Sequence, residues 1–159
     1  MKGLNLIGLN TKKTAELSEK LNNLLANFQV YYQNLRGVHW NIKGPHFFEL
    51  HVKFEELYTE AHTNVDDIAE RILTLGHSPL HTYKDYIKIA EVKVGKDITG
   101  DVKAVELILG NLQTLLQLER ATIEVAAEMG DEGTVSLISD LITSQEKMVW
   151  MFSAWLNKA

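Results

Sequence analysis

Histidine and carboxylate side chains are concentrated between residues 46 and 70 of this 159-residue chain. Two pairs have a spacing of four residues, His51 with Glu55 and Asp66 with Glu70. On a helix, residues four apart project from the same face, so each pair is able to hold a metal ion. Imidazole with carboxylate suits iron, zinc or manganese, whereas carboxylates alone suit harder cations. A single pair of this kind usually lies on a solvent-exposed helix face and binds nothing. The position of the two pairs relative to each other is therefore more informative.

The two pairs share one face of the predicted helix but lie apart along it. Glu55 and Asp66 are eleven positions apart, which is roughly 16 Å along the axis, with a rotation that returns to within about 20° of the same face. A straight helix therefore cannot bring both pairs to one ion. If the helix packs antiparallel on its own copy about an axis near residues 60–61, His51 faces Glu70 and Glu55 faces Asp66. This register predicts two equivalent metal sites across a dimer interface.

A di-iron centre within one chain requires a different pattern. Such bundles take Glu-x-x-His motifs from two helices. None of the six histidines of this chain follows a glutamate by three positions; they are His39, His46, His51, His62, His77 and His81. The sequence therefore disfavours an intrachain carboxylate di-iron centre.

Long segments of helical periodicity lie between a few groups of glycine and proline. Apolar residues at three- and four-residue steps predict helices at 11–39, 46–75, 83–90, 101–129 and 132–156. Asn10 or Thr11 is expected to cap the first helix. The helix over residues 101–129 is expected to bury an apolar stripe that ends at Ala127. The pattern predicts an all-α protein, a four-helix bundle whose second and third long helices are joined by a long crossover containing the short helix. We expect a single domain over residues 1–159.

Composition narrows the classes of function. The chain has no cysteine, which excludes a disulfide framework, a thiolate nucleophile and cysteine-ligated metal. No apolar run approaches the roughly 20 residues needed to span a bilayer. The apolar stretch within residues 1–8 is too short for a signal peptide, so a cytoplasmic location is expected. The formal net charge of −5 argues against a generally basic nucleic-acid-binding surface.

Residues 34–51, which read NLRGVHWNIKGPHFFELH, closely resemble the signature of the Dps group, the DNA-protecting mini-ferritins of starved bacterial cells. The resemblance continues through residues 54–58 and 66–73 and resumes at residues 147–152. Length and helix layout agree over essentially the whole chain. The long crossover is likewise a ferritin-like feature, so the expected fold is a ferritin-like four-helix bundle.

The resemblance implies a ferroxidase and iron store with no organic cofactor. Members of the group are hollow shells of twelve subunits that bind Fe(II) at two-fold interfaces, oxidise it, usually with hydrogen peroxide in preference to oxygen, and store the ferric mineral inside. Carried over to this sequence, His39, His51 and Glu55 come from one subunit, and Asp66 and Glu70 come from its partner. The register predicts the same division, although only the resemblance adds His39. Several relatives have aspartate where this chain has Glu55, which leaves the number of ligands open.

The resemblance also suggests roles around the metal site. Trp40, beside His39, is either a sacrificial electron donor for stray oxidising equivalents, as in relatives, or a core or interface aromatic. Asp131 and Glu132 match the region where relatives line a three-fold iron-entry pore. Ordinary helix capping is the alternative for these two carboxylates.

The remaining histidines are weaker candidates for metal binding. His62 lies near the proposed two-fold axis, where it either binds metal or makes a hydrogen bond at the dimer interface. Three others stand beside chain breakers and are expected in loops or caps, namely His46, His77 and His81.

DNA binding, with association with the nucleoid, is the alternative function. Relatives that bind DNA strongly often use a mobile lysine-rich terminus. Here Lys2 is the only base before the first helix, Lys12 and Lys13 follow at its start, and Lys158 stands near the other end. With a negative net charge, DNA binding would depend on local surface patches or bridging cations.

A third reading is a purely structural bundle, or an adhesin-like surface protein, in which the metal site has decayed. The complete set of five ligand residues argues against this reading. Loss of ferroxidase activity with retention of the shell would support it.

Overall fold

Five helices make up most of the part of the chain that the computed structural model describes, residues 3–158. They are α1 (Thr11–Asn41), α2 (Phe47–Thr74), α3 (Tyr83–Ile89), α4 (Asp101–Glu128) and α5 (Glu132–Trp155). Every boundary lies within two residues of its predicted position, and the described residues contain no strand. The predicted all-α fold class is confirmed. Within the same residues, no helix combines the length and the apolarity that crossing a membrane requires.

Local sequence determines where the helices begin and end. The side chain of Asn10 accepts hydrogen bonds from the N–H groups two and three residues ahead, so it caps α1 as predicted. Beyond the end of α2, Gly76 has a φ of +90°, a conformation that favours glycine. Its N–H group donates to the carbonyl of Leu73 at 2.9 Å. A glycine in this conformation is a common way to end a helix.

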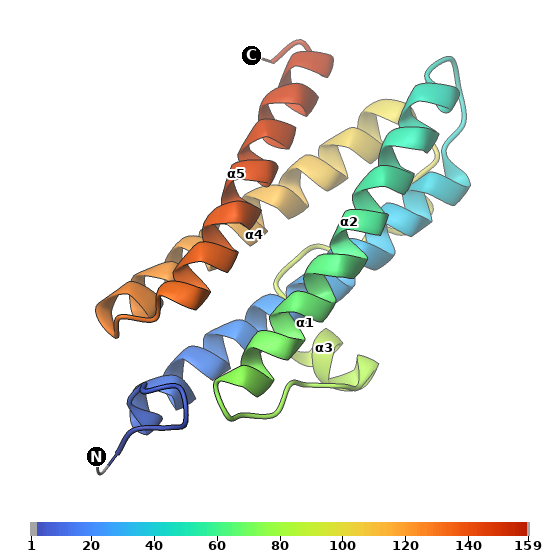
Figure 1. Cartoon of the computed structure of the whole chain (residues 1–159). Helices are drawn as coiled ribbons and strands as arrows, with labels where there is room; N and C mark the ends of the chain where they lie inside the picture. Colours follow the sequence, from blue (N-terminus) through green and yellow to red (C-terminus); the bar gives the residue numbers. More distant parts are fainter. Residues whose placement is uncertain (1–2, 159) are drawn as a thin grey trace.

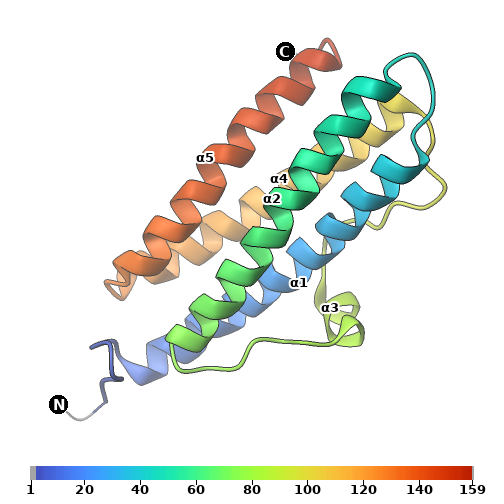
Figure 2. The same cartoon turned by 45° about the vertical axis from the view of Figure 1, so that its right-hand side comes forward.

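The long helices form two antiparallel pairs, α1 with α2 and α4 with α5, which pack against each other (Figure 1). Because α2 and α4 run in the same direction, the crossover between them must return along the length of the bundle. It occupies residues 75–100 and carries α3 past the outer side of α1 (Figure 2). The start of α1 and the end of α5 lie at opposite ends of the bundle (Figure 1).

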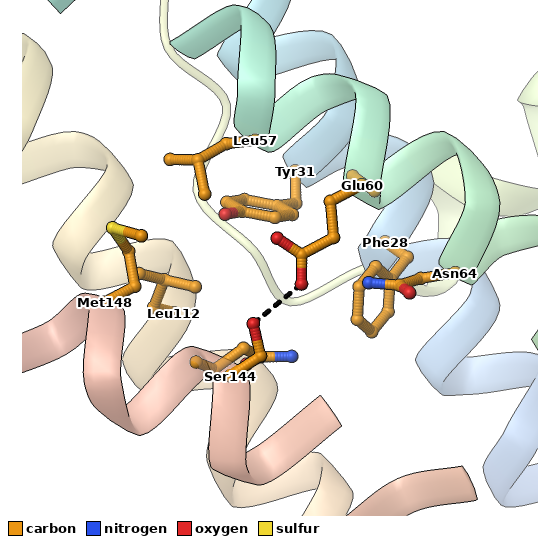
Figure 3. Close-up of a pocket in the computed structure, with 10 residues that line it drawn as sticks. Phe28, Tyr31, Leu57, Glu60, Asn64, Leu112, Ser144 and Met148 are labelled. Atoms are coloured by element: carbon orange, nitrogen blue, oxygen red, sulfur yellow. Dashed lines mark hydrogen bonds between the residues drawn. The ribbon is translucent and has the colours of Figure 1, made fainter. Parts of the chain in front are cut away.

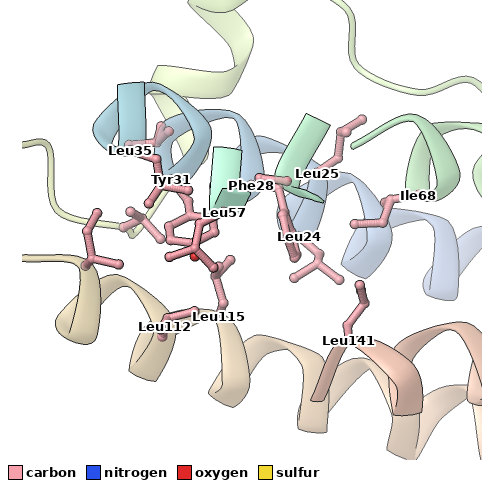
Figure 4. Close-up of a cluster of buried hydrophobic side chains, with 14 of the residues drawn as sticks. Leu24, Leu25, Phe28, Tyr31, Leu35, Leu57, Ile68, Leu112, Leu115 and Leu141 are labelled. Atoms are coloured by element: carbon pink, nitrogen blue, oxygen red, sulfur yellow. The ribbon is translucent and has the colours of Figure 1, made fainter. Parts of the chain in front are cut away.

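Apolar faces of the four long helices meet in one core (Figure 4). In α1, the apolar residues that recur at three- and four-residue steps from Leu17 to Val38 are all buried. In α4 the prediction is wrong at one position, because Ala127 is exposed and Ala126 is buried instead. The buried face continues from Leu115 through Glu119 and Thr122 to Ala126. Because Glu119 and Thr122 are polar, the pattern of apolar residues alone did not predict the buried face of this helix.

Three buried asparagines fasten the crossover to the bundle. The side-chain oxygen of Asn27 accepts a hydrogen bond from the N–H group of Val92 at 2.8 Å. Asn34 accepts from the N–H group of Gly95 at 2.9 Å and donates to the side chain of Asn111 at 2.7 Å. These amides pair with backbone groups that would otherwise be buried without partners.

A second polar connection joins the end of α2 to the start of α5. Asp131, which is 2% exposed, accepts hydrogen bonds from the backbone and the hydroxyl group of Thr134 and forms an ion pair with Arg71. Of the two roles expected for Asp131, the structure assigns it helix capping. Glu132 is exposed, and the expectation that these two carboxylates line a pore stays a prediction.

One buried acid, Glu119, lies between α4 and α5 and forms no ion pair with the residues that the structure describes. Gln145 donates its side-chain N–H group to Oε1 of Glu119, and these residues are 7% and 0% exposed. Neither the second oxygen of Glu119 nor the amide oxygen of Gln145 has a partner in the described residues. Burial raises the pKa of Glu119 to about 8, although the hydrogen bond from Gln145 and the charge of Arg120 oppose this shift. Glu119 is therefore mainly protonated at neutral pH.

We expect Asp131→Ala to destabilise the protein by about 2 kcal/mol or more, because it removes a helix cap and leaves the Arg71 guanidinium without its carboxylate. Thermal or urea unfolding measures the change. Asp140→Ala is the matched control, since Asp140 is exposed on the same helix. Equal stability of the two variants would contradict the structural role of Asp131.

The buried acid predicts a pH dependence of stability. Its pKa is higher in the folded chain than in the unfolded chain, so the folded state binds more protons between about pH 4.5 and pH 8. Stability therefore falls as pH rises through this window, by about 1.4 kcal/mol per pH unit for one fully coupled proton. In metal-free buffer, Glu119→Gln should gain stability over the parent as pH rises from 5 to 9. Glu124→Gln, at an exposed position on α4, should follow the parent, and a parallel curve for Glu119→Gln would refute the assignment.

Candidate metal centre

Two stacked imidazoles, of His39 and His51, lie near the connection from α1 to α2. Figure 1 shows this connection at one end of the bundle. His39 belongs to the last turn of α1, and His51 belongs to the second turn of α2. Their ring centroids are 3.8 Å apart and the rings are inclined by 16°. The antiparallel pairing of the two helices thus brings together residues that are twelve positions apart in the sequence.

Each imidazole is bound to the backbone of the other helix. Nδ1 of His39 lies 2.7 Å from the carbonyl oxygen of His51, and Nδ1 of His51 lies 2.9 Å from the carbonyl oxygen of His39. Because a carbonyl oxygen only accepts a hydrogen bond, each Nδ1 carries a proton. In a neutral imidazole, Nε2 then keeps its lone pair. Both rings therefore present Nε2 as the atom available to a metal ion.

Glu55 completes a cluster of three possible ligands. One ligand atom each from His39, His51 and Glu55 can be chosen so that all three lie within 4.8 Å of one another. His39 is buried, His51 is half-buried and Glu55 is exposed, so the cluster opens to the surface. Among the described residues, no ion pair involves the Glu55 carboxylate, and the hydroxyl group of Tyr58 lies next to it. Two imidazoles and one carboxylate form the ligand set of open non-haem Fe(II) sites.

Aromatic side chains surround the two imidazoles. Phe47 stacks on His51 with ring centroids 4.9 Å apart, and the ring of Tyr58 meets His39 edge-on at 5.2 Å. Partial burial and the neighbouring Glu55 carboxylate raise the pKa of Tyr58. No role at the site was predicted for Phe47 or Tyr58. Their spacing of four and seven positions from His51 places them on the same helical face and was the signal available in the sequence.

The structure does not bring the other two predicted ligands to this cluster. Asp66 and Glu70 are exposed on α2, in the half of the helix beyond Glu55. Within the described residues, the only group of metal-ligand type with this compactness is the one formed by His39, His51 and Glu55. One chain therefore holds three of the five predicted ligands together, as the separation along the helix requires.

The surface around the cluster is unusually apolar for an exposed face. Trp40 is 56% exposed, Phe48 is 83% exposed and Val52 is 52% exposed. The guanidinium group of Arg36 lies 4.7 Å from the ring centroid of Trp40, over the face of the indole. Adjoining apolar side chains of this size are typical of a surface that contacts another protein molecule.

The remaining histidines have local structural contacts. His46 precedes α2 and lies 2.6 Å from the Asp101 carboxylate, and this hydrogen bond is the main cause of the lowered pKa of Asp101. His77 contacts the hydroxyl group of Thr14 at 3.1 Å from the start of the crossover. His81 is exposed there and bonds only locally. The expectation that these three histidines lie in loops or caps is confirmed.

His62 lies on the exposed face of α2, outside the three-ligand cluster. Its ring centroid is 6.0 Å from that of Tyr32. Tyr32 in turn meets Tyr58 edge-on, with centroids 6.2 Å apart. Aromatic side chains therefore connect His62 to the cluster, and its role at the proposed two-fold axis stays a prediction.

Comparison with known proteins agrees with this fold. Residues 18–159 match the family described as the ferritin-like domain. The chain is 43% identical to the DNA protection during starvation protein of Porphyromonas gingivalis, covering 98% of both sequences. It is 49% identical to an uncharacterized protein of Haemophilus influenzae over 93% of this chain and 92% of the other.

A crystal structure of Dps from Vibrio cholerae superposes with a TM-score of 0.95 at 48% identity, covering 98% of each chain. That protein is described as a member of a broad superfamily of ferritin-like diiron-carboxylate proteins. The sequence matches extend over nearly the whole chain, and the helices have the same arrangement. The chain therefore belongs to the Dps group of the ferritin-like family.

Proposed function

We propose that this protein oxidises Fe(II) at sites shared by two subunits and stores the ferric product inside a hollow shell of twelve subunits. The observation that carries the proposal is the cluster of His39, His51 and Glu55, whose ligand atoms converge at an open, apolar surface. Two imidazoles and a carboxylate suit Fe(II) and leave coordination positions for an oxidant. A cytoplasmic location is part of the same proposal.

A second copy of the chain would supply the missing carboxylates. About a two-fold axis near residues 60–61, Asp66 and Glu70 of the partner subunit would face the cluster, and each dimer would contain two equivalent sites. The exposed Trp40, Phe48 and Val52 would be covered in the same contact. The interface would thus bury apolar surface while it completes the ligand set.

The imidazoles and the carboxylates would have different roles in iron oxidation. The two Nε2 atoms would hold Fe(II), and the anionic oxygens would stabilise the Fe(III) that forms. Hydrogen peroxide takes one electron from each of two Fe(II) ions and, with two protons, yields two water molecules. This two-electron route avoids the hydroxyl radical. Trp40 would supply an electron when only one Fe(II) is present.

The first experiment loads the purified protein with Fe(II) without oxygen and adds a stoichiometric pulse of peroxide. We expect fast growth of ferric absorbance, with iron retained by the protein. His51→Ala and Asp66→Ala should each slow this oxidation at least about tenfold, because each removes a ligand. His81→Ala is the matched control, since His81 lies outside the cluster. Oxidation of wild-type samples at the rate of buffer alone would refute the proposal and favour a structural or DNA-binding role.

Mixing the two inactive variants tests whether ligands come from two chains. In a mixed dimer, intact His51 on one chain faces intact Asp66 on the other at one of the two sites. After random exchange we expect activity at about a quarter of the sites. Verified subunit exchange without recovered activity would contradict the shared site.

DNA binding is the second candidate, favoured by the name of the relative from Porphyromonas gingivalis, a DNA protection during starvation protein. Lys93, Lys96 and Lys103 line a groove between the crossover and α4, together with a single acidic residue, Glu106. If this groove binds phosphates, duplex retention should fall steeply with added salt. Replacing the three lysines by glutamine should abolish retention, whereas Lys147→Gln on α5 should not. Absence of binding at low salt would remove this function.

A further inference from the structure

Tyr58 contacts the histidine cluster without being one of the proposed ligands. It lies three positions after Glu55 on α2, and its ring meets His39 edge-on with centroids 5.2 Å apart. Its hydroxyl group lies next to the Glu55 carboxylate. Residues three apart on a helix are neighbours on its surface, so this contact follows from the local sequence. One side chain therefore contacts an imidazole from α1 and the carboxylate from α2.

The glutamates one and five positions beyond Glu55 on α2 have other partners for their carboxylates. Glu56 forms an ion pair with Lys53 on the same helix. Glu60 accepts a hydrogen bond from the hydroxyl group of Ser144 on α5 at 2.7 Å (Figure 3). Glu55 forms no ion pair with the residues that the structure describes, and the phenol three positions ahead is the polar group beside its carboxylate. Whatever orients this carboxylate within one chain is therefore expected to be the phenol.

Glu55 is the ligand of the cluster that most needs a partner to orient it. The two imidazoles are already fixed by their reciprocal hydrogen bonds to the backbone. Glu55 is exposed, and a long exposed side chain of this kind samples several rotamers. Binding an ion selects one of these rotamers, and the lost freedom weakens affinity. A group that orders the carboxylate before the ion arrives therefore strengthens binding.

Tyr58 is itself held in place by packing against α1. Besides its contact with His39, its ring meets Tyr32 edge-on with centroids 6.2 Å apart. The guanidinium group of Arg36 in turn lies 5.3 Å from the ring centroid of Tyr32. A side chain whose rotamer is locked by such packing is able to hold a neighbouring ligand precisely. The phenol is therefore a fixed group beside a flexible carboxylate.

The phenol is in the protonation state that donates a hydrogen bond. A tyrosine hydroxyl keeps its proton at neutral pH, and burial and the charge of Glu55 raise the pKa of Tyr58 further. An ionised carboxylate only accepts, so the O–H group of Tyr58 donates to Glu55. Hydrogen bonds to a charged acceptor are stronger than those between neutral groups. The carboxylate has further lone pairs, which stay available to a metal ion.

We propose that Tyr58 is a positioning residue of the metal centre, whose hydroxyl group holds the Glu55 carboxylate near the Nε2 atoms of His39 and His51. The inference rests on the proposed function and adds a residue to its site. Tyr58 acts through Glu55 and does not itself bind the ion. Partners that orient metal ligands typically contribute about 10–100-fold to metal affinity, and we expect an effect at the lower end because Glu55 is exposed.

Cobalt binding tests this role without an oxidation step. Co²⁺ replaces Fe(II) in the full-length protein, and its visible d–d absorption reports both affinity and ligand geometry. Tyr58→Phe keeps the ring on His39 and removes only the hydroxyl group, so we expect about tenfold weaker Co²⁺ binding and a changed absorption spectrum. Tyr32→Phe is the matched control, since it removes the hydroxyl group of the neighbouring ring, which makes no hydrogen bond within the described residues. This variant should bind Co²⁺ as the parent does.

A double-mutant cycle separates positioning from packing. In a Glu55→Ala background, Tyr58→Phe should change Co²⁺ affinity by less than about twofold, because the carboxylate that it holds is gone. An equal loss in both backgrounds, or an unchanged affinity and spectrum in Tyr58→Phe alone, overturns the proposal. A phenolate-to-Fe(III) absorption band that Tyr58→Phe removes also overturns it, since Tyr58 would then be a ligand.

The outcomes distinguish this inference from the ferroxidase proposal. Wild-type protein that shows the expected coupling in Co²⁺ binding, but oxidises Fe(II) no faster than buffer, refutes the ferroxidase function and leaves the role of Tyr58 standing. Fast iron oxidation together with identical Co²⁺ binding by Tyr58→Phe and the parent refutes only the role of Tyr58. Circular dichroism and shell size verify that each variant keeps its fold.

Discussion

The reciprocal hydrogen bonds between His39 and His51 are the interaction on which the candidate metal centre depends. Each imidazole donates to the backbone of the other helix, so the rings fasten α1 to α2 while their Nε2 atoms remain free. The stacked geometry also removes most rotational freedom from both rings before any ion arrives. A ligand set that is ordered in advance loses less conformational entropy when it binds. The same contacts thus stabilise the helix pair and prepare the site.

The geometry of a single helix explains why one chain does not bring Asp66 to the histidine cluster. Glu55 and Asp66 project from one face of α2, but a straight helix separates them by roughly 16 Å. Bringing Asp66 to the histidines within one chain would require breaking the helix, whereas a second copy requires only an antiparallel contact. The exposed Phe48 and Val52 provide apolar surface for that contact. Under the proposed function, assembly and activity are therefore coupled by the register of α2.

The sequence predicted the helices closely because their ends carry local signals. Asn10 and Gly76 act through neighbouring backbone groups, which a linear sequence displays. Burial in α4 was harder to predict, since Glu119 looks like a solvated residue until the packing of α5 is known. In the metal centre, spacing identified His51 and Glu55 but not His39. The position of His39 depends on how two helices cross, and here the family resemblance supplied what periodicity did not.

The two polar centres differ in how protons and water reach them. The histidine cluster opens to the surface, which under the proposed function would let Fe(II) enter and Fe(III) leave repeatedly. The oxygens around Glu119 lie inside the bundle, where burial holds a proton on the acid and makes each unpaired atom costly. The hydrogen bond from Gln145 to Glu119 ties α5 to α4 there. The exposed cluster is therefore open to ions from solvent, whereas the buried acid acts on the stability of the fold.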